Sequence, residues 1–313
     1  EICSSACGAA QECDGVPPGW SWEGRGWCDT NCQFHPEPDS APTYCADSGG
    51  TWLSDSNEGN PDENKWCCGD DGDGDNFVGE GSQSYQACVN GDVKVCDEKH
   101  LCAEITVKYY YHCVFDPSSS TFRWKGEFYS LFDYPPWNGQ VYCIINQEFP
   151  HTCNISNLKK AIEEGKSLSA GGKRCVLSNG AWVWSNTRGP FQVPELNGEV
   201  IYDSKNIPRI CNSTTLEKAA QGDPNAVVKV TVGGSTYYCY YDGNKYTWTT
   251  TLPSEPFDNN KYLWSESEGF KACNITNICK NFTTTGTNEY QCVLDENGDF
   301  TFIKVSDSNS NSK

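Results

Sequence analysis

The sequence has 313 residues, 20 of them cysteine, and a formal net charge of −19. So many cysteines, with no CxxC pairs at zinc-finger spacing and no CxxCH haem motif, predict disulfides formed in an oxidising compartment. The negative charge argues against nucleic acids and anionic membranes as partners, and no apolar run approaches the ~20 residues that span a bilayer. The chain begins at Glu1 without a leader, so we expect a mature chain whose signal peptide has been removed.

Residues 1–65 form a loop-rich N-terminal region that is dense in cysteine. Two Cys-x3-Cys pairs begin at Cys3 and Cys28, and each is followed by a hairpin-like cysteine, Cys13 and Cys45. Two interpretations stay open. The region is either a set of shortened copies of the repeat described below, with Cys3–Cys13 and Cys28–Cys45 paired, or an unrelated knot of short disulfides.

Residues 66–95 combine an acidic loop with a short hairpin around Cys88, which we expect to pair with Cys67 or Cys68. Aspartates at alternate positions resemble the first ligands of a calcium loop, because they bring several carboxylates to one point. The predicted Ca²⁺ ligands are Asp70, Asp71, Asp73, Asp75 and Glu80. The match to an EF-hand is partial, since Asn76 and Ser82 replace its glycine and its last glutamate. A solvated acidic loop is the alternative.

Four longer units follow, at residues 96–152, 153–210, 211–272 and 273–313. Each opens on a cysteine, which we call the opener, and a spacing of about 60 residues between openers indicates a tandem repeat. A second cysteine, the hairpin cysteine, stands in each unit before a turn and alternating aromatic residues, which is typical of a β-hairpin. Residues that tolerate positive φ occupy three of these turns: Asn179-Gly180, Asp242-Gly243 and Asn297-Gly298.

Short helices are expected at residues 158–164 and 216–221, which end before Gly165 and Gly222. Thr214-x-x-Glu217 has the form of a capping box at the start of the second helix. The predicted fold is therefore mainly β: a tandem array of small disulfide-stapled β-hairpin or β-sandwich-like units with two short helices.

The repeat predicts that each opener pairs with the hairpin cysteine of its own unit. The units at 153–210 and 211–272 contain no other cysteine, which makes them the informative cases. The predicted disulfides are Cys96–Cys113, Cys153–Cys175, Cys211–Cys239 and Cys273–Cys292. Each of these disulfides closes a loop and should raise the free energy of unfolding by about 3 kcal/mol, because it lowers the entropy of the unfolded chain. Sequence leaves open the pairing of Cys7, Cys32, the other of Cys67 and Cys68, Cys102, Cys143 and Cys279.

Asn-x-Ser/Thr sequons provide a second link to the secretory pathway. Asn154, Asn212 and Asn274 each follow an opener directly, and Asn281 is a fourth. Because three sequons share one repeat position, we expect N-linked glycans on equivalent, exposed loops, with Asn281 as an additional candidate.

The remaining candidates favour structural roles over catalysis. His35, His100, His112 and His151 lie far apart in sequence, so packed or exposed side chains are expected rather than a composite metal site. The triplet Asp295, Asn297 and Asp299 falls at a hairpin turn. Most tryptophans recur at repeat positions and should be core residues, with carbohydrate stacking as the alternative. No GxSxG, HExxH or phosphate loop occurs, so we expect no catalytic residues and no enzyme.

The string from Trp66 to Asp71, Trp-Cys-Cys-Gly-Asp-Asp, lies among cysteine-rich hairpins with sequons. It resembles cysteine-rich secreted surface and filament proteins of archaea and bacteria. The resemblance covers residues 66–77 and the general style of the chain. It implies an extracellular surface role and brings no catalytic residues with it.

These observations predict a structural subunit of an extracellular filament, sheath or surface layer. The unit at 273–313 has an opener and a hairpin but lacks a second half, so its sheet should keep an open edge. A neighbouring copy that covers this edge would assemble head-to-tail into a homopolymer. A secreted adhesin or carbohydrate-binding protein is the alternative, and a secreted hydrolase comes third.

Overall fold

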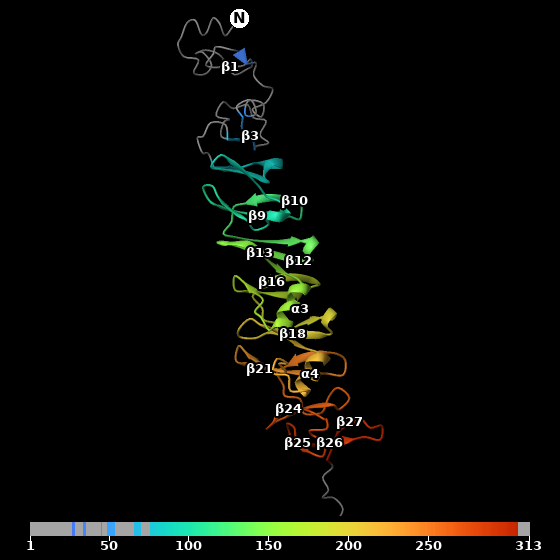
Figure 1. Cartoon of the computed structure of the whole chain (residues 1–313). Helices are drawn as coiled ribbons and strands as arrows, with labels where there is room; N and C mark the ends of the chain where they lie inside the picture. Colours follow the sequence, from blue (N-terminus) through green and yellow to red (C-terminus); the bar gives the residue numbers. More distant parts are fainter. Residues whose placement is uncertain are drawn as a thin grey trace, which may run out of the picture. The chain divides into compact units, whose positions relative to one another are not determined.

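The computed structural model describes residue 45, residues 49–53, 66–69 and 76–305, and the backbone of strands β1 (Trp27–Cys28) and β2 (Phe34–His35). Its contacts divide the chain into two compact units. Unit 1 comprises Glu1–Tyr134 and Val141–His151, and unit 2 comprises Pro135–Gln140 and Thr152–Lys313. Both units are successions of small antiparallel sheets, as Figure 1 shows.

The first sheets in chain order have two or three strands. β1 pairs with β2, and β3 (Thr51–Trp52) pairs with β4 (Cys67–Cys68). Two three-stranded meanders follow: β5 (Phe77–Val78), β6 (Gln86–Val89) and β7 (Asp92–Val95), then β8 (Glu104–Thr106), β9 (Tyr110–Asp116) and β10 (Thr121–Lys125). The next sheet consists of β11 (Tyr129–Tyr134), β12 (Gly139–Ile144) and β13 (Gln147–Cys153).

The remaining sheets lie in unit 2 together with helices α3 (Ile155–Glu164) and α4 (Ser213–Ala220). After α3 come β14 (Ser169–Ala170), β15 (Lys173–Ser178) and β16 (Ala181–Ser185), then β17 (Phe191–Val193), β18 (Gly198–Tyr202) and β19 (Pro208–Cys211). After α4 come β20 (Lys229–Val232), β21 (Ser235–Tyr241) and β22 (Tyr246–Thr249), the pair β23 (Tyr262–Ser265) and β24 (Gly269–Ala272), and β25 (Asn281–Thr283), β26 (Glu289–Leu294) and β27 (Phe300–Lys304).

From β8 onward, two kinds of sheet alternate along the chain. We call β8–β10, β14–β16, β20–β22 and β25–β27 hairpin sheets, because the central strand of each carries a hairpin cysteine. We call β11–β13, β17–β19 and β23–β24 linking sheets, because each ends at an opener or directly before one. The predicted fold, mainly β with small disulfide-stapled units and two short helices, is confirmed for the described residues.

The residue types in the turns and the alternating aromatic residues in the strands explain why the hairpin sheets form. In β15–β16, Ser178 pairs with Ala181, and the two residues between them, Asn179 and Gly180, have φ of 50° and 81°. This is the two-residue turn that favours positive φ at both positions. The register places each hairpin cysteine opposite an aromatic residue: Cys113 opposite Trp124, Cys175 opposite Trp184, Cys239 opposite Trp248 and Cys292 opposite Phe302.

Both helices begin earlier than the sequence predicted. Asn154 caps α3 by accepting a hydrogen bond from the Asn157 N–H at 2.9 Å, and Asn212 caps α4 in the same way through the Thr215 N–H. The expected capping box at Thr214 and Glu217 is therefore wrong. The asparagine that follows the opener forms the cap instead, because its backbone is extended and its side-chain oxygen can accept an N–H of the first helical turn.

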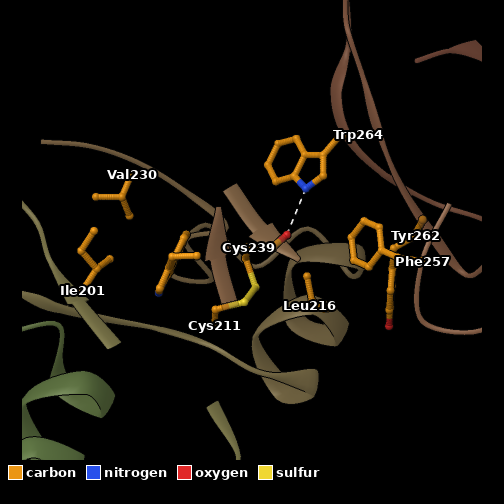
Figure 2. Packing of buried hydrophobic residues seen from close by; sticks show 10 residues of the cluster. Ile201, Cys211, Leu216, Val230, Cys239, Phe257, Tyr262 and Trp264 are labelled. Atoms are coloured by element: carbon orange, nitrogen blue, oxygen red, sulfur yellow. Dashed lines mark hydrogen bonds between the residues drawn. A yellow bond between two sulfur atoms is a disulfide. The ribbon is translucent and has the colours of Figure 1, made fainter. Parts of the chain in front are cut away.

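Each of the longer repeats buries a small core of its own around the disulfide that staples it. Figure 2 shows one such core in unit 2, where the Cys211–Cys239 disulfide lies among Leu216 of α4 and the aromatic rings of the following linking sheet. Its buried members include Ile201, Val230, Trp248, Phe257, Tyr262 and Trp264. A core of this size is marginal without a covalent staple.

Candidate functional site

The repeated site of this chain is the junction at which a disulfide ties the start of a repeat to its hairpin sheet. The structure contains the four disulfides expected from the repeat: Cys96–Cys113, Cys153–Cys175, Cys211–Cys239 and Cys273–Cys292. Their Cα atoms lie 4.9 to 5.2 Å apart, within the usual range for a disulfide. Three of them therefore connect the end of a linking sheet to the centre of the next hairpin sheet.

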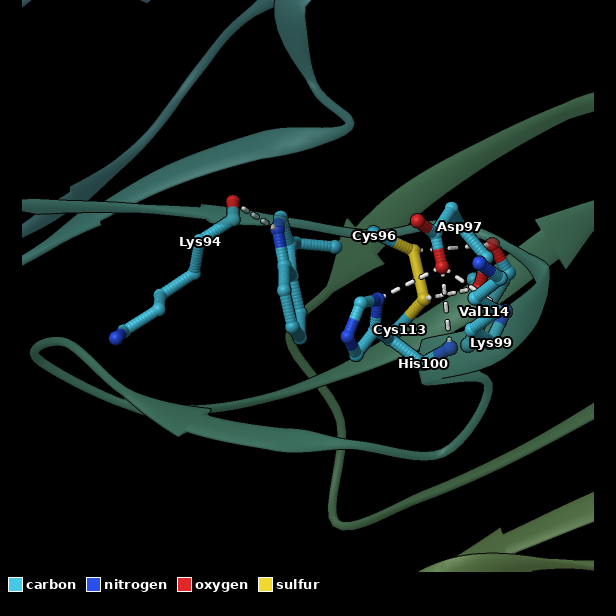
Figure 3. A network of polar contacts seen from close by, with 8 residues as sticks. Lys94, Cys96, Asp97, Lys99, His100, Cys113 and Val114 are labelled. Atoms are coloured by element: carbon cyan, nitrogen blue, oxygen red, sulfur yellow. Dashed lines mark hydrogen bonds and ion pairs between the residues drawn. A yellow bond between two sulfur atoms is a disulfide. The ribbon is translucent and has the colours of Figure 1, made fainter.

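The residue after each opener supports the junction with a polar cap. At the first junction this residue is Asp97, whose carboxylate accepts the N–H groups of Lys99 and His100 and contacts the His100 ring nitrogen at 2.7 Å (Figure 3). Burial alone would raise the pKa of the Asp97 carboxyl, but these hydrogen bonds hold the pKa below its usual value. The charged cap is therefore retained beside the Cys96–Cys113 disulfide.

At the other junctions the cap is a sequon asparagine, and the structure distinguishes these asparagines from one another. Asn154 and Asn212 are half-buried, and their Nδ2 atoms donate to the carbonyl oxygens of Trp137 at 3.0 Å and Leu196 at 3.1 Å. Asn274 is half-buried and caps through its oxygen, whereas Asn281 is exposed on strand β25. Asn154, Asn212 and Asn274 therefore share one capping position, as the repeat predicted, but this position is half-buried and not an exposed loop, and glycosylation there stays a prediction.

Cysteine pairings that the sequence left open are decided by the fold. Cys68 bonds Cys88, and Cys45 bonds Cys67, so the expected Cys28–Cys45 pair is wrong. Cys45 and Cys67 meet because Cys67 lies in β4 opposite Trp52 of β3, and the Gly50 N–H, just before β3, donates to the Cys45 carbonyl at 2.9 Å. The proposed pair Cys3–Cys13, together with Cys7 and Cys32, lies outside the described residues.

Cys102 and Cys279, which both lie six residues after an opener, share one backbone geometry. Both adopt left-handed φ, 65° and 61°, and their N–H groups donate to the carbonyl oxygens of Cys113 and Cys292 at 2.9 and 2.8 Å. Cys102 is bonded to Cys143 in strand β12. Cys279 is exposed and is the free cysteine of the described residues.

The predicted calcium ligands lie almost entirely outside the described part of the chain. Asp70, Asp71, Asp73 and Asp75 are not described, and Glu80 is exposed before a short 3-10 turn. Within the described residues, no group of three or more His, Cys, Asp or Glu side chains is placed to hold a metal ion. At the end of the loop, Asn76 accepts the Asn90 N–H at 2.6 Å. Calcium binding stays a prediction.

The histidines and tryptophans take structural positions. The His112 ring is fully buried and contacts Glu104 at 3.0 Å, while His151 contacts Gln147 at 2.6 Å, so the described histidine side chains have separate partners. For His35, in β2, only the backbone is described. Among described tryptophans, none is exposed, and five are buried: Trp124, Trp182, Trp184, Trp248 and Trp264. At the last hairpin, Asp295 accepts the N–H groups of Asn297 and Asp299, which is the turn expected there.

Sequence reasoning missed a glutamate that belongs to a junction. Glu199, the second residue of the wholly buried strand β18, accepts hydrogen bonds from the Thr247 hydroxyl and the Trp248 N–H. One repeat earlier, Gln140 of β12 accepts the Trp184 N–H at 3.0 Å. The sequence did carry a sign of this contact, because Gly139-Gln-Val and Gly198-Glu-Val stand at equivalent positions of successive repeats.

No known family, characterised protein or solved structure matches this chain. The fold and its junctions define a disulfide-rich protein of repeated small β units. Seven disulfides among the described residues indicate a secreted or extracellular protein. In the part of the chain that the structure describes, no helix is both long and apolar enough to cross a bilayer.

Proposed function

We propose that this chain is a non-enzymatic structural subunit of an extracellular filament, sheath or surface layer that assembles head-to-tail. The observation that carries the proposal is the repeated covalent junction, in which disulfides tie linking sheets to the hairpin sheets that follow them. An array stapled in this way resists stretching. The Cys211–Cys239 bond, for example, spans 28 residues. Because the disulfide closes this loop, pulling on an unfolded chain cannot add the roughly 95 Å that the loop would span at full extension.

The last hairpin sheet provides the surface on which a neighbour would dock. In β9 and β15 the residues beside the hairpin cysteine, on the face opposite to it, are buried: His112 and Val114, and Arg174 and Val176. These strands contact β11 and β17 of the linking sheets. In β26 the equivalent residues, Gln291 and Val293, are half-buried, as Tyr238 and Tyr240 of β21 are, but Ile303 of the neighbouring β27 is 48% exposed. A sheet face that leaves Ile303 uncovered in this way favours an interface.

Assembly tests this proposal. The full chain, secreted under oxidising conditions and concentrated, should form polymers visible by negative-stain imaging and sedimentation. Ile303→Lys should block them, because it places a charge on the open face. Val95→Lys is a matched control, since Val95 is 39% exposed on β7. A wild-type chain that stays a monodisperse monomer at high concentration, or an Ile303→Lys chain that polymerises as before, would reject the proposal.

One observation favours the alternative, an adhesin or carbohydrate-binding protein. Phe128, Tyr129 and Phe149 are 71%, 57% and 56% exposed, and all three lie on or beside the sheet β11–β13. The Tyr129 ring meets the buried Tyr142 ring edge-on, with centroids 6.0 Å apart. Exposed rings on one sheet offer flat apolar platforms.

A glycan array tests the alternative. Binding by the monomer that is lost in a Phe128→Ala/Tyr129→Ala/Phe149→Ala variant would support it. Tyr109→Ala provides the control, because Tyr109 is 63% exposed outside that sheet. A monomer that binds no glycan on the array would reject it.

A further inference from the structure

The repeat at 153–210 holds three of the five arginines of the sequence: Arg174, Arg188 and Arg209. They come from three segments: strand β15, the loop between β16 and β17, and strand β19. The fold brings all three to one turn, residues 203–206. Arg188 donates to the Asp203 carbonyl at 2.7 Å, and Arg209 donates to the Asp203 carboxylate at 3.0 Å. Arg174 donates through Nε to the side-chain oxygen of Asn206 at 2.8 Å.

Arg174 and Arg188 meet at a single neutral oxygen. The Oδ1 atom of Asn206 accepts hydrogen bonds from Arg174 Nε at 2.8 Å and from Arg188 Nη1 at 3.2 Å. The other bonds of these two side chains go to main-chain carbonyls, from Arg174 Nη1 to Asn186 and from Arg188 Nη1 to Asp203. These oxygens satisfy N–H groups, but they carry no formal negative charge to neutralise two guanidinium groups.

Among the described residues, no carboxylate forms an ion pair with Arg174 or Arg188. The Asp203 carboxylate is already engaged by Arg209, and it also accepts two main-chain N–H groups of its own turn. Arg174 is 8% exposed, and burial lowers the pKa of its guanidinium, which the positive charge of Arg188 lowers further. Because buried charges in proteins are normally paired, an anion from outside the described part of the chain would stabilise this arginine pair.

Donor nitrogens suited to an anion are left over. Arg174 Nη2 and the Nε and Nη2 atoms of Arg188 donate to no described residue, and none of the three atoms is fully buried. A guanidinium binds two oxygens of one oxyanion through parallel N–H bonds. Since Asn206 holds both side chains at one point, these donors are placed to bind the same anion.

The same strand position is neutral or compensated in the other repeats. The residue before the hairpin cysteine is His112 in β9, and Glu104 lies 3.0 Å from its ring nitrogen. In β21 this residue is Tyr238, whose ring meets the Trp264 ring edge-on, and in β26 it is Gln291. The uncompensated arginine pair is therefore a property of one repeat, and the repeated fold does not require it.

We propose that Arg174 and Arg188 form a binding site for one small oxyanion, a sulfate, a phosphate or a carboxylate, beside the turn at residues 203–206. The ligand is small, because the net charge of −19 repels polyanions from the protein as a whole. The bound anion neutralises the pair and strengthens the contact between β15 and this turn. The inference does not depend on assembly, since every residue of the site belongs to one chain.

Isothermal titration calorimetry of the full, oxidised chain tests the site. Sodium sulfate, sodium phosphate and sodium acetate are titrated separately, at one ionic strength set with sodium chloride. At least one of them should bind saturably, and the three titrations together distinguish a tetrahedral oxyanion from a carboxylate. Arg188→Gln should weaken this binding by about 10- to 100-fold, the loss expected for hydrogen bonds to a charged group. The matched control is Arg123→Gln, which removes an arginine paired with Asp116 at 3.1 Å and should bind as wild type does.

Asn206→Asp separates charge compensation from loss of structure. This variant supplies a carboxylate at the shared acceptor, and aspartate tolerates the left-handed φ of 59° found there. It should abolish anion binding while its melting temperature stays at or above that of wild type. The inference would be overturned if none of the three anions bound saturably at millimolar concentrations. Unchanged binding in Arg188→Gln or in Asn206→Asp would also overturn it.

Discussion

Trp248 donates two hydrogen bonds to Glu199 across a junction: its main-chain N–H donates to the Glu199 carboxylate, and its indole N–H donates to the Glu199 carbonyl at 3.0 Å. Both residues are buried, at 8% and 4% exposed. The pair connects the inner strand of a linking sheet to the third strand of the next hairpin sheet. Gln140 and Trp184 repeat the side-chain half of this contact one unit earlier.

We predict that Glu199→Ala lowers the free energy of unfolding by about 1–3 kcal/mol, because it leaves the buried Trp248 N–H without an acceptor. Glu199→Gln should retain most of the stability, since Gln140 fills the equivalent place. Denaturant unfolding measures both changes, and Glu195→Ala, an exposed site in the same segment, is the control. Equal stability of the alanine variant and wild type would show that the contact contributes nothing.

Removal of a staple should destabilise its unit. Cys211→Ala/Cys239→Ala opens a loop with a sequence separation of 28 residues, for which loop entropy predicts a loss of about 3 kcal/mol. Urea unfolding of the monomer measures the loss, with Cys279→Ser as the control because that thiol is free. Non-reducing peptide mapping checks the pairs directly. A fragment that joined Cys153 to Cys211 would contradict the pairing.

Stability should fall at alkaline pH through buried tyrosines. Burial, assisted by the charge of Asp258, raises the pKa of Tyr246 and of Tyr262 to about 12. In the unfolded chain these phenols ionise near pH 10, so their contribution is complete below that pH and is lost as the pH rises from about 10 to about 12. The free energy of unfolding, measured against pH in a Cys279→Ser background to prevent thiol exchange, should decrease over this range.

Tyr246→Phe should flatten that decrease, because phenylalanine cannot ionise. Phe128→Leu is the control and should leave the decrease unchanged, since Phe128 has no ionisable group and is 71% exposed. An alkaline profile that is identical in wild type and Tyr246→Phe would exclude Tyr246 as a source of the effect.

Glycan occupancy should follow the accessibility of each asparagine. Asn281 is exposed, but it pairs across the sheet with Gln291, which pairs with Ile303, so a glycan there would cover the face proposed for docking, and we expect Asn281 to be bare in chains that assemble. We expect Asn274, which caps only through its oxygen, to carry an N-linked glycan more completely than Asn154 and Asn212. In the last two, the amide nitrogen that would carry the sugar already donates to a main-chain carbonyl. Mass spectrometry of native glycopeptides gives the occupancies. Complete modification at Asn154 and Asn212 with bare Asn274 would contradict the expected order.

Calcium should stabilise the acidic loop if its aspartates share an ion. Ca²⁺ at about 100 times its dissociation constant would add about 2.7 kcal/mol to the stability of the part that binds it. The melting temperature should therefore rise in Ca²⁺, and Asp73→Ala should remove the rise while Asp92→Ala, an exposed acid in β7, should not. Equal melting temperatures in chelator and in millimolar Ca²⁺ would reject the site.

Local features of this protein could be predicted from its sequence. Turns such as Asn179-Gly180, the alternation of Trp182 and Trp184, and the pairing of each opener with its own hairpin cysteine all arise within about 30 residues, where backbone preference and loop closure dominate. The repeat strengthened each of these predictions because the same short pattern recurs at a regular spacing.

Only the tertiary structure decided what joins one sheet to the next. Cys102–Cys143 spans 41 residues, and the Tyr202 and Glu199 contacts connect separate sheets. The position that attaches a linking sheet to the hairpin sheet before it holds Cys143 in β12, Tyr202 in β18 and Trp264 in β23, so no residue type marks it in the sequence. Packing decides these contacts, because a buried carbonyl or N–H accepts any partner that the neighbouring sheet brings within hydrogen-bonding distance.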